Sequence, residues 1–256
     1  MTSILELLRC EFRKTRRRYL IAAALIMTVL QLCWCLYGEC TEEIVTHGWM
    51  LFLYQFPLVN AIFLPLLSMM IAAGLCDIEH KGTMLKQFFT CTERNRLFDA
   101  KLLYGLLLIT ACVLLSWMVI VLYGFLHRFE GPFPLKLYLL YFLFTLCPTI
   151  MIYLIQHTLS ILFQNQTIPC FTGIIGTFCG VFSMFLQNIP WLRKLLPWGH
   201  YGALQFVGMF GWTRETRYEY VYFETMHTDW LFFLALILSA CLLYLIGRNL
   251  FSRKEV

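Results

Sequence analysis

Leu102–Tyr123 runs for 22 residues without a charge, and this one stretch already restricts the fold. About 20 apolar residues, each rising about 1.5 Å, cross a hydrocarbon core of about 30 Å. Backbone groups in lipid must satisfy their own hydrogen bonds, so such a stretch is expected to be helical. Five more stretches have this character: 19–37, 51–75, 137–163, 168–185 and 230–246. The sequence predicts an all-α membrane protein with six transmembrane helices, forming one domain over residues 1–256.

Hydrophobic residues make up 60% of the chain and charged residues 14%, against about 25% charged residues in a typical soluble domain. Of the Lys and Arg residues, six precede residue 19, five lie in 76–101 and three follow residue 246. These 14 would share one side of the membrane, and the other side would hold six. The positive-inside rule therefore predicts that both termini are cytoplasmic. Nothing in this pattern points to nucleic acid.

Residues 1–18 have the pattern of an amphipathic helix. Ile4, Leu8 and Phe12 recur every four residues with Leu5 beside them, and Arg16-Arg17-Arg18 follow at the membrane edge. Such a helix is expected to lie on the inner leaflet, with its apolar stripe in lipid and its cations near anionic head groups. A simple stop-transfer charge cluster would explain the arginines but not the stripe.

The second predicted span carries Pro57 and Pro65, with Gln55 and Asn60 nearby. Proline removes an intrahelical hydrogen bond and kinks a helix. Kinks combined with uncharged polar groups are typical of a helix that faces a conduit or a moving interface, although static bundles also contain them. We therefore treat Gln55, Pro57 and Asn60 as conduit candidates.

The fifth span contains Gly176-x-x-x-Gly180, a spacing that lets another helix approach closely. Packing within the bundle is the first interpretation of this motif, and contact with a second permease-like chain is the other. Between the fifth and sixth spans, segment 186–229 begins with an apolar half that is too interrupted to span the membrane. Its tryptophans Trp191, Trp198 and Trp212 favour re-entrant or interfacial helices at the outer face.

The segment 76–101 between spans two and three has an aromatic face. A short helix is expected there, and its exposed apolar residues would be Met84, Leu85, Phe88 and Phe89. Exposed aromatics on the cytoplasmic side need a partner, which is either the lipid surface or a soluble protein with a hydrophobic groove.

The six spans contain no Asp, Glu, Lys or Arg. Ion-coupled carriers place such groups within the membrane, so coupling to a proton or sodium gradient is disfavoured. The chain also lacks a phosphate loop of the form Gly-x-x-x-x-Gly-Lys-Ser/Thr. We expect it not to be an enzyme and to hydrolyse no ATP itself.

Three segments together resemble the permease subunits of type-2 ABC exporters. They are the run 11–18 (Glu-Phe-Arg-Lys-Thr-Arg-Arg-Arg), the proline-bearing second span, and the run 79–86 (Glu-His-Lys-Gly-Thr-Met-Leu-Lys) followed by Arg94-Asn95-Arg96 and Lys101. Within that group the chain is most similar to the small permeases of bacterial lantibiotic and bacitracin immunity or resistance transporters. The resemblance implies a place in the bacterial cytoplasmic membrane.

The resemblance also implies partners and roles. The chain would be one half of a pair, completed by a second copy or by a sister six-span subunit. The 76–101 segment would be a coupling helix that docks on a soluble ATPase subunit, which alone binds ATP and Mg. The contact residues would be Glu79, Met84, Leu85, Phe88, Phe89, Arg94 and Arg96. Segment 186–229 would form the outer gate, and Gly176 and Gly180 would join the dimer or conduit.

The sequence leaves the substrate open. The aromatic outer segment is compatible with a bulky amphiphile such as a cationic antimicrobial peptide, expelled to give self-immunity or resistance. The alternatives are an exporter of another substrate (a lipid, an ion or a drug) and a non-transporting immunity or sensor protein that binds a toxin at the outer face.

Overall fold

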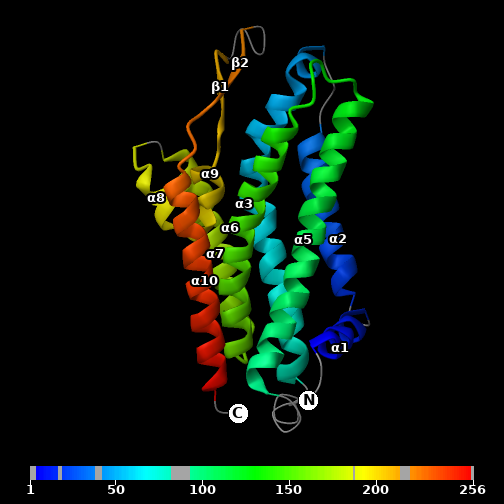
Figure 1. Cartoon of the computed structure of the whole chain (residues 1–256), viewed down its shortest axis with the longest axis vertical. Coiled ribbons are helices and arrows are strands. Elements are labelled where there is room, and N and C mark those ends of the chain that lie inside the picture. Colours follow the sequence, from blue (N-terminus) through cyan, green and yellow to red (C-terminus); the bar gives the residue numbers. More distant parts are fainter. Residues whose placement is uncertain are drawn as a thin grey trace.

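A computed structural model describes residues 4–16, 19–37, 42–81, 93–186, 188–213 and 220–254. The elements are α1 (Ile4–Arg16), α2 (Leu20–Leu36), α3 (Glu42–Lys81), α5 (Arg94–Leu126), α6 (Leu135–Leu162), α7 (Thr167–Phe185), α8 (Trp191–Leu195), η1 (Pro197–Gly199), α9 (His200–Ala203), β1 (Val207–Phe210), β2 (Tyr222–Thr225) and α10 (Trp230–Ser252). Figure 1 shows the long helices standing side by side, with α1 lying across one end and the β1–β2 hairpin at the other.

Five of the described helices are long and apolar enough to cross a membrane. These helices, α3, α5, α6, α7 and α10, contain the predicted spans from the second to the sixth, except that α6 ends one residue early. The first predicted span corresponds to α2, whose 17 residues would rise about 25 Å. The expectation of an apolar multi-helix membrane protein is confirmed at this level.

Two helices are much longer than their predicted spans. α3 has 40 residues where 51–75 was expected, and α5 has 33 where 102–123 was expected. At about 1.5 Å per residue, α3 is about 60 Å long, which is about twice the thickness of the hydrocarbon core. The predicted spans stop at the charged segment 76–101. Both helices continue into that segment, where Glu79 of α3 and Lys101 of α5 pair with each other.

Segment 186–229 departs from the expectation of an all-α fold. The short helices α8, η1 and α9 occur where interfacial helices were predicted. After them, β1 and β2 pair as an antiparallel hairpin, in which Val207 faces Thr225 and Phe210 faces Tyr222. The rings of Phe210 and Tyr222 stack with centroids 5.6 Å apart. Strands of four residues are too short to give a clear alternating pattern, so the sequence did not reveal them.

The buried core consists of two hydrophobic clusters, which follow one another along the bundle. α3 packs against α2, α6 and α7, and α10 packs against α5 and α6. Toward the hairpin end, the core is rich in aromatic rings around Trp49, whose indole lies 4.9 Å from Phe133 and 5.3 Å from Phe129, centroid to centroid. At the opposite end, where α1 lies across the bundle and α10 ends (Figure 1), ion pairs between side chains join the helices.

Candidate functional site

α3 ends at Lys81 and α5 begins at Arg94, and both ends lie beside α1. The four apolar residues expected to dock on an ATPase, Met84, Leu85, Phe88 and Phe89, lie outside the described residues. The described residues on either side of them form the candidate site, because any movement of the segment must pass through the two helices that carry it.

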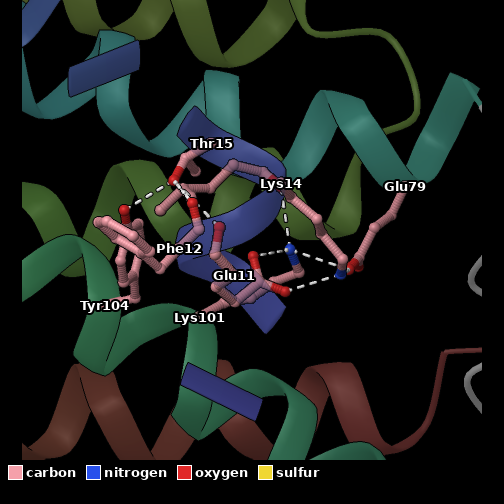
Figure 2. Close-up of polar contacts among 8 residues, drawn as sticks. Glu11, Phe12, Lys14, Thr15, Glu79, Lys101 and Tyr104 are labelled. Atoms are coloured by element: carbon pink, nitrogen blue, oxygen red, sulfur yellow. Dashed lines mark hydrogen bonds and ion pairs between the residues drawn. The ribbon is translucent and has the colours of Figure 1, made fainter. Parts of the chain in front are cut away.

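Lys101 on α5 is the centre of a buried ion cluster at this end (Figure 2). Its Nζ lies 3.0 Å from Oε2 of Glu11 and 2.9 Å from Oε1 of Glu79. It also donates to the carbonyl oxygen of Leu75 at 2.9 Å. Nζ of Lys14 lies 2.9 Å from Glu11 Oε1 and 3.1 Å from Glu79 Oε1. Two ammonium groups and two carboxylates therefore join α1, α3 and α5 with no net charge.

The burial of this cluster makes each member dependent on the others. The Lys101 side chain is 0% exposed, and the two carboxylates are nearly as inaccessible. Removing one partner from a buried ion pair typically costs about 3–5 kcal/mol, because the other charge is left without compensation. Burial alone would raise the pKa of Glu11. The neighbouring Lys101 and Lys14 outweigh that effect and lower the pKa below its ordinary value.

A hydroxyl pair extends the connection between α1 and α5. The oxygens of Thr15 Oγ1 and Tyr104 OH lie 2.6 Å apart in a buried contact. On α1 the buried residues are Leu7, Glu11 and Thr15, which are spaced by four and share one face of the helix. This face holds α1 against the bundle, and the face that carries Leu5 and Phe12 points away from it.

The start of α5 is also tied to the end of α10. Arg94 donates from Nη1 to the carbonyl oxygens of Ser252 and Lys254, at 3.0 and 2.8 Å. One turn later, Asp99 pairs with Arg248 at 3.3 Å and accepts from Tyr244 OH at 2.9 Å. The end of α3 is fixed to α6, because Nε2 of His80 lies 3.1 Å from the carbonyl oxygen of Ser160. Burial lowers the pKa of His80.

These contacts give the predicted coupling residues different positions. The Glu79 side chain points into the cluster, where it is not available to a docking protein. Arg94 is hydrogen-bonded to backbone carbonyl groups at the end of α10. Arg96 remains partly exposed, with Nε 3.1 Å from Oε2 of Glu93.

The conduit candidates on α3 fall into two environments. Asn60 is buried in a hydrogen-bond network, accepting from Gln31 Nε2 at 2.6 Å and donating to Tyr141 OH at 2.8 Å and Thr145 Oγ1 at 3.2 Å. Asn60 links α2, α3 and α6, so in this conformation it is buried within the helix bundle of a single chain. Pro57 is buried one turn away, within a continuous helix.

Gln55 lies in a different environment, on the wall of a cavity of about 460 Å³ toward the hairpin end. The cavity is bounded by α2, α3, α7 and the residues just before β1. Its lining mixes apolar and polar side chains: Trp34, Cys35, Tyr37, Tyr54, Gln55, Leu58, Val59, Met184, Phe185 and Gln205.

Gly176 and Gly180 are approached by Trp198 of the same chain. A Cβ on Gly180 would lie 2.6 Å from the Trp198 backbone, and a Cβ on Gly176 would overlap the indole ring. The close approach predicted for this motif therefore occurs within the bundle, against η1. The other two gate candidates, Trp191 and Trp212, are 61% and 50% exposed.

Sequence reasoning missed the ion cluster. The sequence pattern places Lys101 at the end of the charged segment 76–101, whereas the residue lies two turns inside α5 and is fully buried. One signal was present: Leu102 follows Lys101 and opens an apolar run, and Glu11 lies four positions after Leu7, on the same face of α1. A single sequence does not show which distant acid meets the lysine.

The comparison with protein families agrees with this architecture. The model of the ABC-2 family transporter proteins matches residues 7–180, from α1 to α7. The match covers more than half of the chain, so the chain belongs to this family. It is a multi-pass membrane protein and a permease component of an ABC transporter, a family whose members work with an ATPase partner. No curated protein matches the chain.

Proposed function

We propose that this chain is the membrane half of an ATP-driven exporter that expels an amphiphilic antimicrobial peptide or a related antibiotic, giving self-immunity or resistance. In this proposal both termini are in the cytoplasm of a bacterial cell, and a second permease half completes the conduit. ATP and Mg are bound by a separate ATPase, whose docking site is the 76–101 segment.

The ion cluster is the single observation that carries the coupling part of the proposal. Lys101 and Glu79 lie on the two helices that carry segment 82–92, and both contact Glu11 of α1 or its neighbour Lys14. A force applied to that segment by an ATPase would therefore move α1, α3 and α5 together. Contiguous polar networks on rigid helices are suited to carrying such a displacement.

The outer end supports an amphiphilic substrate. The 460 Å³ cavity lined by Gln55 and Trp34 offers both amide groups and apolar surface, the mixture that ligand pockets use to orient and bury a molecule. Exposed aromatic side chains surround this end, among them Trp212, Tyr220 and Tyr222. Aromatic rings with polar tips favour the membrane–water interface, where an amphiphilic peptide would arrive.

The same outer cavity favours a second candidate function, in which the chain binds a toxin without transporting it. The two functions differ in their need for ATP. A lipid or drug exporter would share the ATP requirement and differ only in substrate.

The test is resistance measured in cells that carry the chain with its ATPase, or with an ATPase whose phosphate-loop lysine is replaced. Export predicts that protection against the peptide is lost with the inactive ATPase. Protection that persists without ATP hydrolysis would favour toxin binding.

A further inference from the structure

A pocket of about 420 Å³ lies in the angle between α1 and α5. Its walls come from both helices, and it is separate from the ion cluster, which occupies the buried face of α1. Three arginines of α1 line it: Arg9, Arg13 and Arg16. These residues are spaced by four and three, so their side chains leave one face of the helix.

The three guanidinium groups are available to a ligand. All three residues are exposed, and among the described residues no ion pair or hydrogen bond engages their side chains. Guanidinium groups bind phosphate oxygens through two parallel hydrogen bonds, which an ammonium group cannot do. A row of three therefore favours a phosphate-bearing partner.

The rest of the lining is mainly apolar, and it comes from Leu5, Leu8 and Phe12 of α1 and from Tyr104 and Leu107 of α5. The Tyr104 hydroxyl is already hydrogen-bonded to Thr15, so Tyr104 contributes mainly its aromatic ring to the wall of the pocket. An inorganic anion would gain nothing from these walls. A phospholipid would place its head group at the arginines and the start of its acyl chains against the leucines.

The surface of α5 continues the pocket along the membrane. Leu107, Leu114 and Met118 are exposed, and their spacing of seven and four places them on one face of the helix. An acyl chain that leaves the pocket beside Leu107 would follow this apolar track. The arginine row, the apolar lining and the exposed apolar face of α5 thus favour the same type of occupant.

We propose that the α1–α5 pocket binds an anionic glycerophospholipid, with its phosphate on Arg9, Arg13 and Arg16 and its acyl chains along α5. The bound lipid fixes the exposed side of α1, as the ion cluster fixes its buried side. The site does not depend on which molecule the protein transports.

The test is native mass spectrometry of the intact chain, purified in mild detergent with its ATPase and titrated with equal amounts of phosphatidylglycerol and phosphatidylcholine. One phosphatidylglycerol per chain should be retained in preference to phosphatidylcholine. Replacing the three arginines (Arg9→Gln, Arg13→Gln and Arg16→Gln) should weaken phosphatidylglycerol binding roughly a hundredfold, at about fivefold per basic residue.

A matched control removes the same charge elsewhere, through Arg128→Gln, Lys136→Gln and Arg253→Gln, and should leave the affinity within about threefold. Leu107→Ala keeps all the arginines and should weaken binding by roughly fivefold through the lost apolar contact. Equal retention of the two lipids, or an equal effect of the two triple variants, would overturn the proposal. Loss of the ATPase from the arginine variant with phosphatidylglycerol still bound would assign this face to the ATPase instead.

Discussion

Nζ of Lys101 lies 2.9 Å from Oε1 of Glu79, so a single ion pair bridges the two helices on either side of segment 82–92. The pair is inaccessible to water, and Glu11 and Lys14 of α1 complete it. A buried pair of this kind contributes little net stability compared with apolar residues, but it fixes the arrangement of the helices that hold it.

Lys101→Met should destabilise the protein by about 3–5 kcal/mol, because two carboxylates then share only Lys14. Thermal unfolding in detergent measures the effect. The double variant Lys101→Met with Glu79→Gln should recover part of the loss, since one uncompensated charge is removed. If the double variant loses as much stability as the two single variants together, Lys101 and Glu79 are not coupled in the folded protein.

Thr15→Val should loosen α1 from α5 by removing its hydrogen bond with Tyr104, at a cost of about 1 kcal/mol. Tyr104→Phe removes the same bond from the other side and should have a similar effect. The double variant should be hardly worse than either single one. Hydrogen exchange of the α1 amides would report the loosening. If the double variant instead loses the sum of the two single effects on stability, the two hydroxyl groups act independently.

The helical part of the fold could be predicted from sequence because lipid leaves few choices for the backbone. Runs without charge located α2, α3, α5, α6, α7 and α10, and the spacing of Ile4, Leu8 and Phe12 predicted α1. The contacts that define the site could not be predicted in the same way. Lys101 and Glu11 are 90 positions apart, and their pairing depends on how α1 packs. Similarly, the spacing of Gly176 and Gly180 predicts that another segment approaches closely, but it does not indicate that this segment carries Trp198.

Acidification should weaken the packing of segment 186–229 through His200. Burial lowers the pKa of His200 from 6.5 to about 4, and its Nε2 lies 3.1 Å from the carbonyl oxygen of Lys194. Between pH 6.5 and about 4 the unfolded chain binds more protons than the folded one, so stability falls as the pH falls through this window. Melting temperatures measured across it should decline, and His200→Gln should flatten the decline. An unchanged slope in that variant would exclude His200 as the cause.

Gly180→Ala should destabilise the contact between α7 and η1 by about 1–3 kcal/mol, because the added Cβ would lie 2.6 Å from backbone atoms of Trp198, which adjust less easily than the end of a side chain. Cys179→Ala, at the exposed neighbouring position, is the matched control and should change little. Gly176→Ala should be partly rescued by Trp198→Phe, which shortens the ring. Should Gly180→Ala instead separate permease dimers without changing the melting temperature, the motif would serve the contact between chains.

The proposed orientation is tested with cysteines placed at exposed sites on the two ends, Lys136→Cys and Arg253→Cys. A membrane-impermeant thiol reagent on intact cells should label the first variant above the background of the unmodified chain and should leave the second unlabelled. The native Cys76 is unsuitable because it is buried. Labelling of Arg253→Cys without permeabilisation would reverse the orientation and place the ion cluster outside the cell.

Native mass spectrometry of the chain co-purified with its own ATPase shows whether the permease works within an ATP-driven complex. We expect a complex with two permease halves and two soluble ATPase subunits, each ATPase carrying a phosphate loop. Phe88→Asp with Phe89→Asp should remove the ATPases and leave the permease in the membrane, whereas Lys101→Met should leave them bound. A permease that confers resistance while no ATPase co-purifies with it would contradict the account.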